Sequence, residues 1–195
     1  TKEVRKDILE LLGLIKPYTY LGSFDRENLA IAIHKEEDKA EYVKDYIRAH
    51  EDESGIIYCA TRKEVDALYY YLKERGVSIA KYHGGLKDEE KNYYQDEFLK
   101  DNYNVMIATN AFGMGIDKSN VRYIIHFSLC KNIESYYQEI GRGGRDGEKT
   151  ECHLLYNRDD IRTLEYLIYT TVGNTRKEIE IKKLQYMIDF CEYDK

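Results

Sequence analysis

Residues 55–82, GIIYCATRKEVDALYYYLKERGVSIAKY, decide the fold of this chain. A short apolar run at 55–59 is followed by apolar residues every three or four positions, which predicts a helix over residues 63–75. Gly76 supplies a left-handed stop for that helix, and a second β-branched run follows at 78–82. Strand, helix and strand in this order are the repeating unit of a parallel sheet.

The same alternation extends outward in both directions. Further strands are expected at 18–23, 28–34, 104–109, 122–127 and 151–156. Further helices are expected at 3–12, 88–99, 133–140, 158–170 and 176–190. The last two helices are joined at Gly173 and Asn174, so they should form a helical hairpin beside the sheet. The expected fold class is α/β, a parallel sheet with helices on both faces followed by a C-terminal helical hairpin.

Length and charge limit the classes of function. A chain of 195 residues suits one domain with a small appendage. No apolar run approaches the roughly 20 residues that span a bilayer, and the N-terminus is charged, so we expect no membrane contact and a cytoplasmic protein. The net charge of −6 argues against a non-specific nucleic-acid binder, since phosphates need an excess of Lys and Arg on the binding face. Any nucleic-acid function must therefore come from local motifs.

The cysteines give little support for a metal site, and none is expected. Four of them, Cys59, Cys130, Cys152 and Cys191, are widely scattered and form no CxxC pair. Three lie in or next to expected strands, where a cysteine is more often a small buried hydrophobic residue than a ligand.

The strongest motif is QEIGRGGRDG, residues 138–147. Arg142 and Arg145 stand three positions apart in a turn that glycines leave sterically open, directly after a helix. Guanidinium groups placed in this way can reach polyphosphate oxygens and neutralise the charge of a phosphoryl group in transfer. A glycine-rich surface turn with solvated arginines is the plainer alternative, but Gln138 before the turn and Asp146 after it favour the functional interpretation.

Three further stretches follow strands directly. Residues 108–117 place Thr109 where a hydroxyl could donate to a nucleic-acid phosphate, and Asp117 where a carboxylate could accept from a ribose or hold an arginine. Taken alone, this stretch is better explained as a tight connection that needs glycine. Residues 58–62 and 82–86 each open a helix, where free N–H groups can bind a phosphate, although acidic residues at 88–90 would compete for that site. No GxxxxGK[ST] loop occurs, so this chain alone cannot cradle the phosphates of ATP.

In order and spacing, six stretches resemble the RecQ family of superfamily 2 helicases: residues 23–26 (SFDR), 57–59 (IYC), 82–86 (YHGGL), 108–117 (ATNAFGMGID), 133–138 (IESYYQ) and 141–147 (GRGGRDG). The resemblance covers about residues 1–190. It implies a RecA-like second lobe at 1–157, with an N-terminal linking helix, and a hairpin at 158–195 that leads into a truncated zinc-binding module. ATP with Mg²⁺ would be bound mainly by an absent first lobe, and zinc only in the absent module. The first cysteine ligand of that module would come just after Lys195, so Cys191 is not expected to be a ligand.

The resemblance also implies roles for ten residues. Arg142 and Arg145 would be the arginine fingers, with Arg145 the better candidate. Gln138, Asp117 and Gly115 would help to bind the nucleotide. Contacts to one strand of DNA would come from Thr61, Arg62, His83, Gly84 and Thr109.

The implied function is that of the second motor lobe of an ATP-dependent 3′–5′ DNA helicase, with single-stranded and duplex DNA and the first lobe as partners. The chain alone is expected to be a monomer that does not hydrolyse ATP, and in a bacterium it would be associated with the nucleoid. Two alternatives are a non-enzymatic module that binds single-stranded nucleic acid or a protein, and the matching lobe of an RNA helicase. Salt-sensitive binding by the chain alone would favour the first, and stimulation by RNA the second.

Four positions depart from the usual family pattern. Glu27, Ser119 and Cys130 stand where the family usually has proline, and Gly143 where alanine is usual. Each lost proline should cost roughly 0.4–1 kcal/mol through a freer unfolded chain. We expect looser loops with the functional groups retained.

Overall fold

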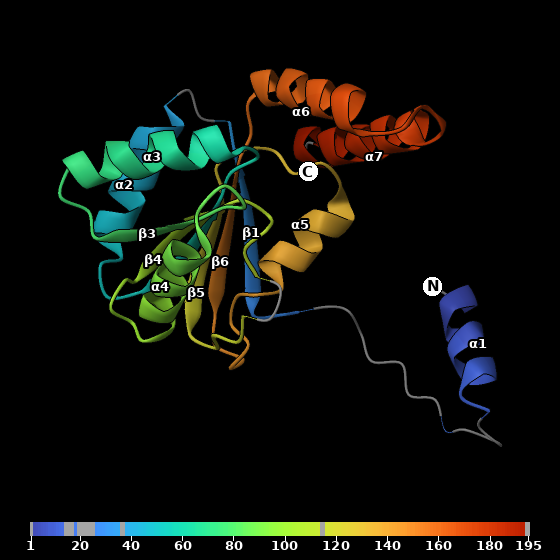
Figure 1. Cartoon of the computed structure of the whole chain (residues 1–195), viewed down its shortest axis with the longest axis horizontal. Helices are drawn as coiled ribbons and strands as arrows, with labels where there is room; N and C mark the ends of the chain where they lie inside the picture. Colours follow the sequence, from blue (N-terminus) through green and yellow to red (C-terminus); the bar gives the residue numbers. More distant parts are fainter. Residues whose placement is uncertain (1, 14–17, 19–25, 36–37, 114–115, 194–195) are drawn as a thin grey trace.

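The computed structural model describes residues 2–13, 18, 26–35, 38–113 and 116–193 (Figure 1). Within them, six strands form one sheet in the order β1-β6-β5-β2-β4-β3, and every neighbouring pair is parallel. The strands are β1 (Leu29–His34), β2 (Ser54–Tyr58), β3 (Ile79–Tyr82), β4 (Val105–Ala108), β5 (Val121–His126) and β6 (Thr150–Leu155).

Helices cover both faces of this sheet. They are α1 (Lys2–Leu11), α2 (Lys39–Ala49), α3 (Arg62–Glu74), α4 (Asp88–Leu99), α5 (Ile133–Ile140), α6 (Arg158–Thr171) and α7 (Asn174–Glu192). The buried residues of α2 and α3 share one apolar cluster with the sheet, and those of α4 to α7 share the other. Helix α1 lies away from the sheet, while α6 and α7 pair as a hairpin (Figure 1). The expected fold class is confirmed.

The β2–α3–β3 unit forms as its sequence indicates. Four apolar side chains of α3 face the sheet and are buried: Val65, Leu68, Tyr69 and Leu72. Thr61 begins the helix with a capping box, in which its hydroxyl accepts from the Glu64 N–H at 3.2 Å. Gly76 ends it with φ of 77°, a conformation that costs glycine little. Local capping and burial of the apolar face therefore both stabilise this helix.

Strand β2 lies in the middle of the sheet and is buried along its whole length. Ile56 contributes to the cluster under α4 to α7, and Ile57 to the cluster under α2 and α3. Side chains alternate between the faces of a strand, so a strand covered on both sides needs a continuous apolar run. This requirement explains the run at 55–59.

Helix α2 was not anticipated from the sequence pattern. Asp38 caps it by accepting from the Glu41 N–H at 3.0 Å, and Val43 and Ile47 are its buried residues. The strand expected at 18–23 lies, except for Tyr18, outside the described residues. Among the helices that the structure describes, none combines the length and the apolar character needed to cross a membrane.

Candidate functional site

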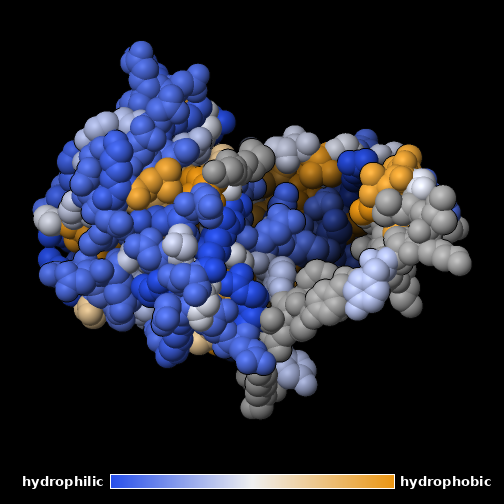
Figure 2. All heavy atoms as spheres, turned by 90° about the horizontal axis from the view of Figure 1, so that it is seen from below, coloured by the Kyte–Doolittle hydropathy of each residue, from blue (hydrophilic) through white to orange (hydrophobic). Residues whose placement is uncertain are grey.

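The arginine segment, residues 141–147, joins the end of α5 to the start of β6. The Gly144 N–H donates to the carbonyl of Val121, the first residue of β5, at 3.0 Å. Gly144 has φ of 52°, which the tight turn requires. The segment therefore lies at the amino ends of β5 and β6. Figure 2 views the molecule from below, from the side where these strands begin, and hydrophilic side chains dominate that surface.

Two side chains that precede β1 hold this segment from the outside. Arg26 Nη2 donates to the carbonyls of Gly143 at 3.0 Å and Gly144 at 2.9 Å. Asn28 Nδ2 donates to the carbonyls of Gly144 and Glu148, both at 2.9 Å. Arg26 ends the SFDR stretch, whose other residues lie outside the described part of the chain. This stretch was predicted only as part of a family resemblance, and no role in the site was expected for Arg26.

Arg145 lies at the surface in an ion pair. Its Nη1 donates to Asp117 Oδ1 and to the Ile116 carbonyl, each at 3.1 Å. The Arg145 side chain is 37% exposed and that of Asp117 is 90% exposed. An exposed pair of this kind contributes only about 0–1 kcal/mol, so the guanidinium can exchange its partner at little cost. Of the two roles that the sequence left open for Asp117, the structure shows it holding an arginine.

Arg142 points inward from the same segment. Its Nη1 donates to the carbonyl of Gly113, and no hydrogen-bond partner is described for its buried Nε. A Cβ atom at Gly113 would overlap the Arg142 guanidinium, and φ of 121° there also requires glycine. Both arginines thus contact the chain that follows β4. Gln138 is exposed on α5, and Gly115 lies outside the described residues.

The five residues expected to contact DNA come together at the opposite edge. They follow the carboxyl ends of three strands that are neighbours in the sheet, β2, β4 and β3: Thr61, Arg62, His83, Gly84 and Thr109. The carboxyl edge of a parallel sheet is where ligands of such folds usually bind. The two predicted sets therefore occupy different edges of the sheet, with the arginine segment at the amino ends.

These five residues differ in their exposure to solvent. His83 is 5% exposed, lies 3.3 Å from Asp66 Oδ1 and accepts from the Gly85 N–H at 3.1 Å. Thr109 is also buried, and the hydroxyl of Thr61 caps α3. Arg62 and Gly84 are exposed. Of these five residues, Arg62 and the backbone of Gly84 are consequently the parts that face solvent.

Gly143 makes a testable contact within the arginine segment. It is buried, and a Cβ atom there would overlap the methyl group of Thr150. Gly143→Ala should therefore lower the free energy of unfolding by about 1–3 kcal/mol, the usual cost of overpacking.

Thr150→Ser should relieve that overlap in the double variant. Serine lacks the methyl but keeps the hydroxyl that donates to the Val121 carbonyl at 3.0 Å. Urea unfolding of the two single variants and the double variant measures the coupling between the two sites, expected to be about 0.5–3 kcal/mol. Simple additivity of the two changes would contradict the proposed overlap.

Comparison with known proteins identifies the family. The model of the helicase conserved C-terminal domain matches residues 38–147, more than half of the chain, and the chain belongs to this family. It is 44% identical over 191 residues to the ATP-dependent DNA helicase RecQ of Bacillus subtilis, covering 98% of this chain and 32% of that protein. It is 40% identical over 198 residues to the RecQ-like DNA helicase BLM of Xenopus laevis, covering 97% and 14%. Within the family, the chain is a C-terminal lobe of the RecQ type.

Solved structures agree on the fold. Dbp5 of S. cerevisiae, bound to RNA and ADP BeF3, matches with a TM-score of 0.65 at 21% identity, over 96% of this chain and 53% of that one. The E. coli DEAD-box protein SrmB, bound to the regulator of ribonuclease activity A, matches with a TM-score of 0.59 at 22% identity, over 71% and 81%. The RecA-like sheet expected from the sequence is confirmed. The chain spans about a third of the length of its bacterial RecQ relatives.

Proposed function

We propose that this chain is the second motor lobe of a RecQ-like, ATP-dependent 3′–5′ DNA helicase. In this proposal, Arg142 and Arg145 act on ATP and Mg²⁺ held mainly by a first RecA-like lobe, with help from Gln138, Asp117 and Gly115. Family membership supports the helicase class. Arginine side chains that enter a nucleotide site from outside stabilise the charge of phosphoryl transfer.

The main support is the setting of the Arg145 guanidinium, which is partly exposed and, among the described residues, hydrogen-bonded to Asp117 and to the Ile116 carbonyl. Polyphosphate oxygens offer a guanidinium stronger, charge-assisted hydrogen bonds than an exposed carboxylate does. When the first lobe approaches with ATP, Arg145 exchanges Asp117 for phosphate. Hydrolysis removes that partner, and Arg145 returns to Asp117.

DNA binding is assigned to the carboxyl edge. Arg62 and the exposed backbone at Gly84 contact the phosphates of one strand, while Thr61, His83 and Thr109 shape this edge from below. Alternating closure and opening of the two lobes then moves the enzyme along that strand. Since the net charge is −6, the chain alone should bind DNA weakly, and the first lobe completes the binding surface.

The chain is further proposed to act as a monomer, with residues 1–157 as the motor lobe and 158–195 as the link to a zinc-binding module. Leu164 of α6 and Met187 of α7 belong to the same apolar cluster as Ile124 of the sheet. The hairpin therefore packs as part of the motor lobe's core. Such packing would transmit lobe movement to whatever follows the hairpin.

The experiment is a reconstitution. The chain is mixed with a first lobe that carries the phosphate-binding loop, and ATP hydrolysis is measured without nucleic acid, with single-stranded DNA and with RNA. We expect turnover only from the mixture, with stronger stimulation by DNA. Turnover by the chain alone would contradict the assignment of the ATP site, and stimulation by RNA alone would favour an RNA helicase.

Arg26 provides a second test, because it positions the arginine segment without being proposed to touch ATP. Arg26→Ala removes its hydrogen bonds to the Gly143 and Gly144 carbonyls. In the two-lobe protein we expect kcat for ATP to fall roughly 100-fold, since a displacement of about 1 Å can cost that much. Arg26→Lys keeps the charge but not the fork geometry, and should recover only part of the rate. Unchanged kcat in Arg26→Ala would exclude a positioning role.

A further inference from the structure

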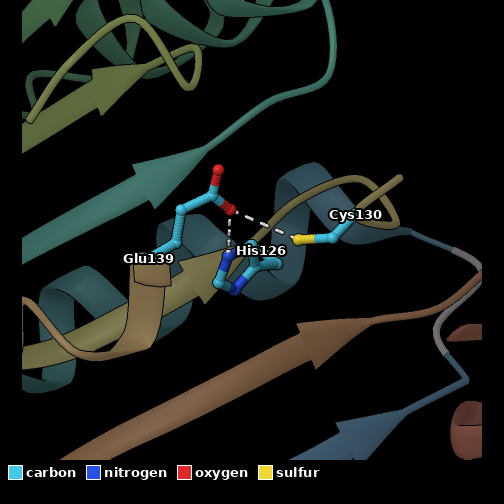
Figure 3. Close-up of side chains that lie close together, drawn as sticks. All are labelled: His126, Cys130 and Glu139. Atoms are coloured by element: carbon cyan, nitrogen blue, oxygen red, sulfur yellow. Dashed lines mark hydrogen bonds and ion pairs between the residues drawn. The ribbon is translucent and has the colours of Figure 1, made fainter. Parts of the chain in front are cut away.

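Three side chains from different elements meet under the sheet's carboxyl edge, and the function proposed above uses none of them. His126 ends β5, Cys130 lies in the connection that follows, and Glu139 lies in the last turn of α5. His126 Nε2 is 2.8 Å from Glu139 Oε2, and Cys130 Sγ donates to the same oxygen at 3.3 Å (Figure 3). All three residues are buried.

This cluster is buried and contains a polar atom for which no partner is described. The side chain of His126 is 1% exposed and that of Glu139 is 11% exposed. His126 Nδ1 is buried, and no hydrogen-bond partner is described for it. Among the described residues, the recorded ion pair of Glu139 is with His126 alone. A buried carboxylate normally needs a cation or several donors, and a buried polar atom without a partner calls for an explanation.

We propose that His126, Cys130 and Glu139 form a binding site for a divalent transition metal, with Zn²⁺ as the best fit. The three potential ligand atoms lie within 4.8 Å of one another. Tetrahedral Zn²⁺ with nitrogen, sulfur and oxygen ligands needs them about 3.3–3.8 Å apart, so small side-chain movements suffice. A sulfur ligand selects Zn²⁺ over Mg²⁺ or Ca²⁺, which prefer oxygen ligands.

The charges balance when the metal binds. The Cys130 S–H bond breaks, its proton passes through the solvent to buffer, and an S–Zn bond forms without any change of oxidation state. One thiolate, one carboxylate and one neutral imidazole then surround Zn²⁺, so the buried site is neutral overall.

A cavity gives the site an entrance and an open ligand position. It has a volume of about 270 Å³, and its lining includes all three ligand residues together with Lys131 and Ser135. A metal with three protein ligands keeps a fourth position for water or a small anion, as in catalytic rather than purely structural zinc sites. Here that position would face the cavity, between the sheet edge and the α6–α7 hairpin.

Cys130 distinguishes this site from the other thiols. Within the described ranges, these three side chains are the one group of three His, Cys, Asp or Glu residues in which the ligand atoms lie so close together. Cys152, on β6, is also buried and does not belong to the group. Cys152→Ala is therefore the matched control for Cys130→Ala.

The test is a titration of the metal-free chain with Co²⁺ and then Zn²⁺. Co²⁺ should bind at one equivalent and give the near-ultraviolet charge-transfer band of a cobalt thiolate, and Zn²⁺ should displace it. Cys130→Ala should abolish the band and weaken binding by more than the roughly 10- to 100-fold that loss of an outer-shell partner costs. Cys152→Ala should keep both the band and the affinity.

Thermal unfolding distinguishes a variant that has lost the metal site from one that has failed to fold. Zn²⁺ should raise the Tm of the unmodified chain and of Cys152→Ala, but not that of Cys130→Ala or of the isosteric Glu139→Gln. The proposal is overturned if the folded unmodified chain gives no thiolate band. It is equally overturned if Cys130→Ala retains the band and the affinity.

Discussion

Replacing Arg145 by alanine in the two-lobe protein is expected to lower DNA-stimulated ATP turnover by a factor of about 10³ to 10⁵. That is the effect of losing an arginine finger in other phosphoryl-transfer systems. The variant should fold normally, because the ion pair to Asp117 is exposed and contributes about 0–1 kcal/mol. Steady-state ATPase assays with saturating single-stranded DNA measure the loss, and urea unfolding checks the fold.

Arg162→Ala is the matched control for this experiment. Arg162 is 86% exposed on α6 and lies 3.7 Å from Asp159, so it also loses one surface ion pair. Its turnover should equal that of the unmodified protein. If Arg145→Ala retained near-normal turnover while the control behaved as expected, Arg145 would not be the finger.

Replacing Arg142 is harder to interpret than replacing Arg145. Its guanidinium donates to the Gly113 carbonyl and fills the space above that glycine. Removing it would leave a cavity and take one hydrogen bond from the Gly113 carbonyl, as well as removing a charge. A loss of turnover in Arg142→Ala would therefore combine structural and chemical effects. Arg145→Ala removes mainly the chemical effect.

The two edges of the lobe are joined by one stretch of chain. Thr109 belongs to the set assigned to DNA, and Asp117, eight positions later, holds Arg145.

Local patterns predicted most of the fold. Helices α4 and α5 have the bounds expected from their sequences, because acidic residues fill the first turn of α4 and Asn132 caps α5. Helix α2 was missed, although Tyr42, Val43, Tyr46 and Ile47 have helical spacing and Asp38 supplies a cap.

The candidate sites were less visible in the sequence. The arginines and Asp117 could be named from motifs, since each motif is a continuous stretch. Arg26 reaches the arginine segment across a sequence separation of 117 residues, which no local pattern encodes. His126, Cys130 and Glu139 come together only because β5, its following connection and α5 fold back on one another. Their spacing matches no familiar metal-binding motif.

Raising the pH above about 9 is expected to destabilise the chain steeply through its buried thiols. Burial raises the pKa of Cys152 and of Cys191 from 9.0 to about 12, and raises the pKa of Cys59 and Cys130 well above 9.0. Below about pH 8, the thiols are mostly protonated in both the folded and the unfolded states, so the free energy of unfolding hardly depends on these groups.

Between about pH 9 and 12, the unfolded chain releases thiol protons that the folded chain keeps. The free energy of unfolding then falls by about 1.4 kcal/mol per pH unit for each thiol, or roughly 5.5 kcal/mol per unit for four. Since domains are stable by about 5–15 kcal/mol, the chain should unfold within two or three units. Burial also raises the pKa of Tyr58 and Tyr123, which extends the loss above pH 10.

Urea unfolding at several values between about pH 8 and 11 measures this slope. Cys152→Ala removes one titrating thiol and should lower the slope by about 1.4 kcal/mol per pH unit, whatever it does to stability at neutral pH. Ile124→Val is the matched control, because Ile124 is buried in the same cluster and has no titratable group. It should lower stability equally at every pH. A free energy of unfolding that stayed constant across this range would show that the thiols ionise in the folded chain as readily as in the unfolded one.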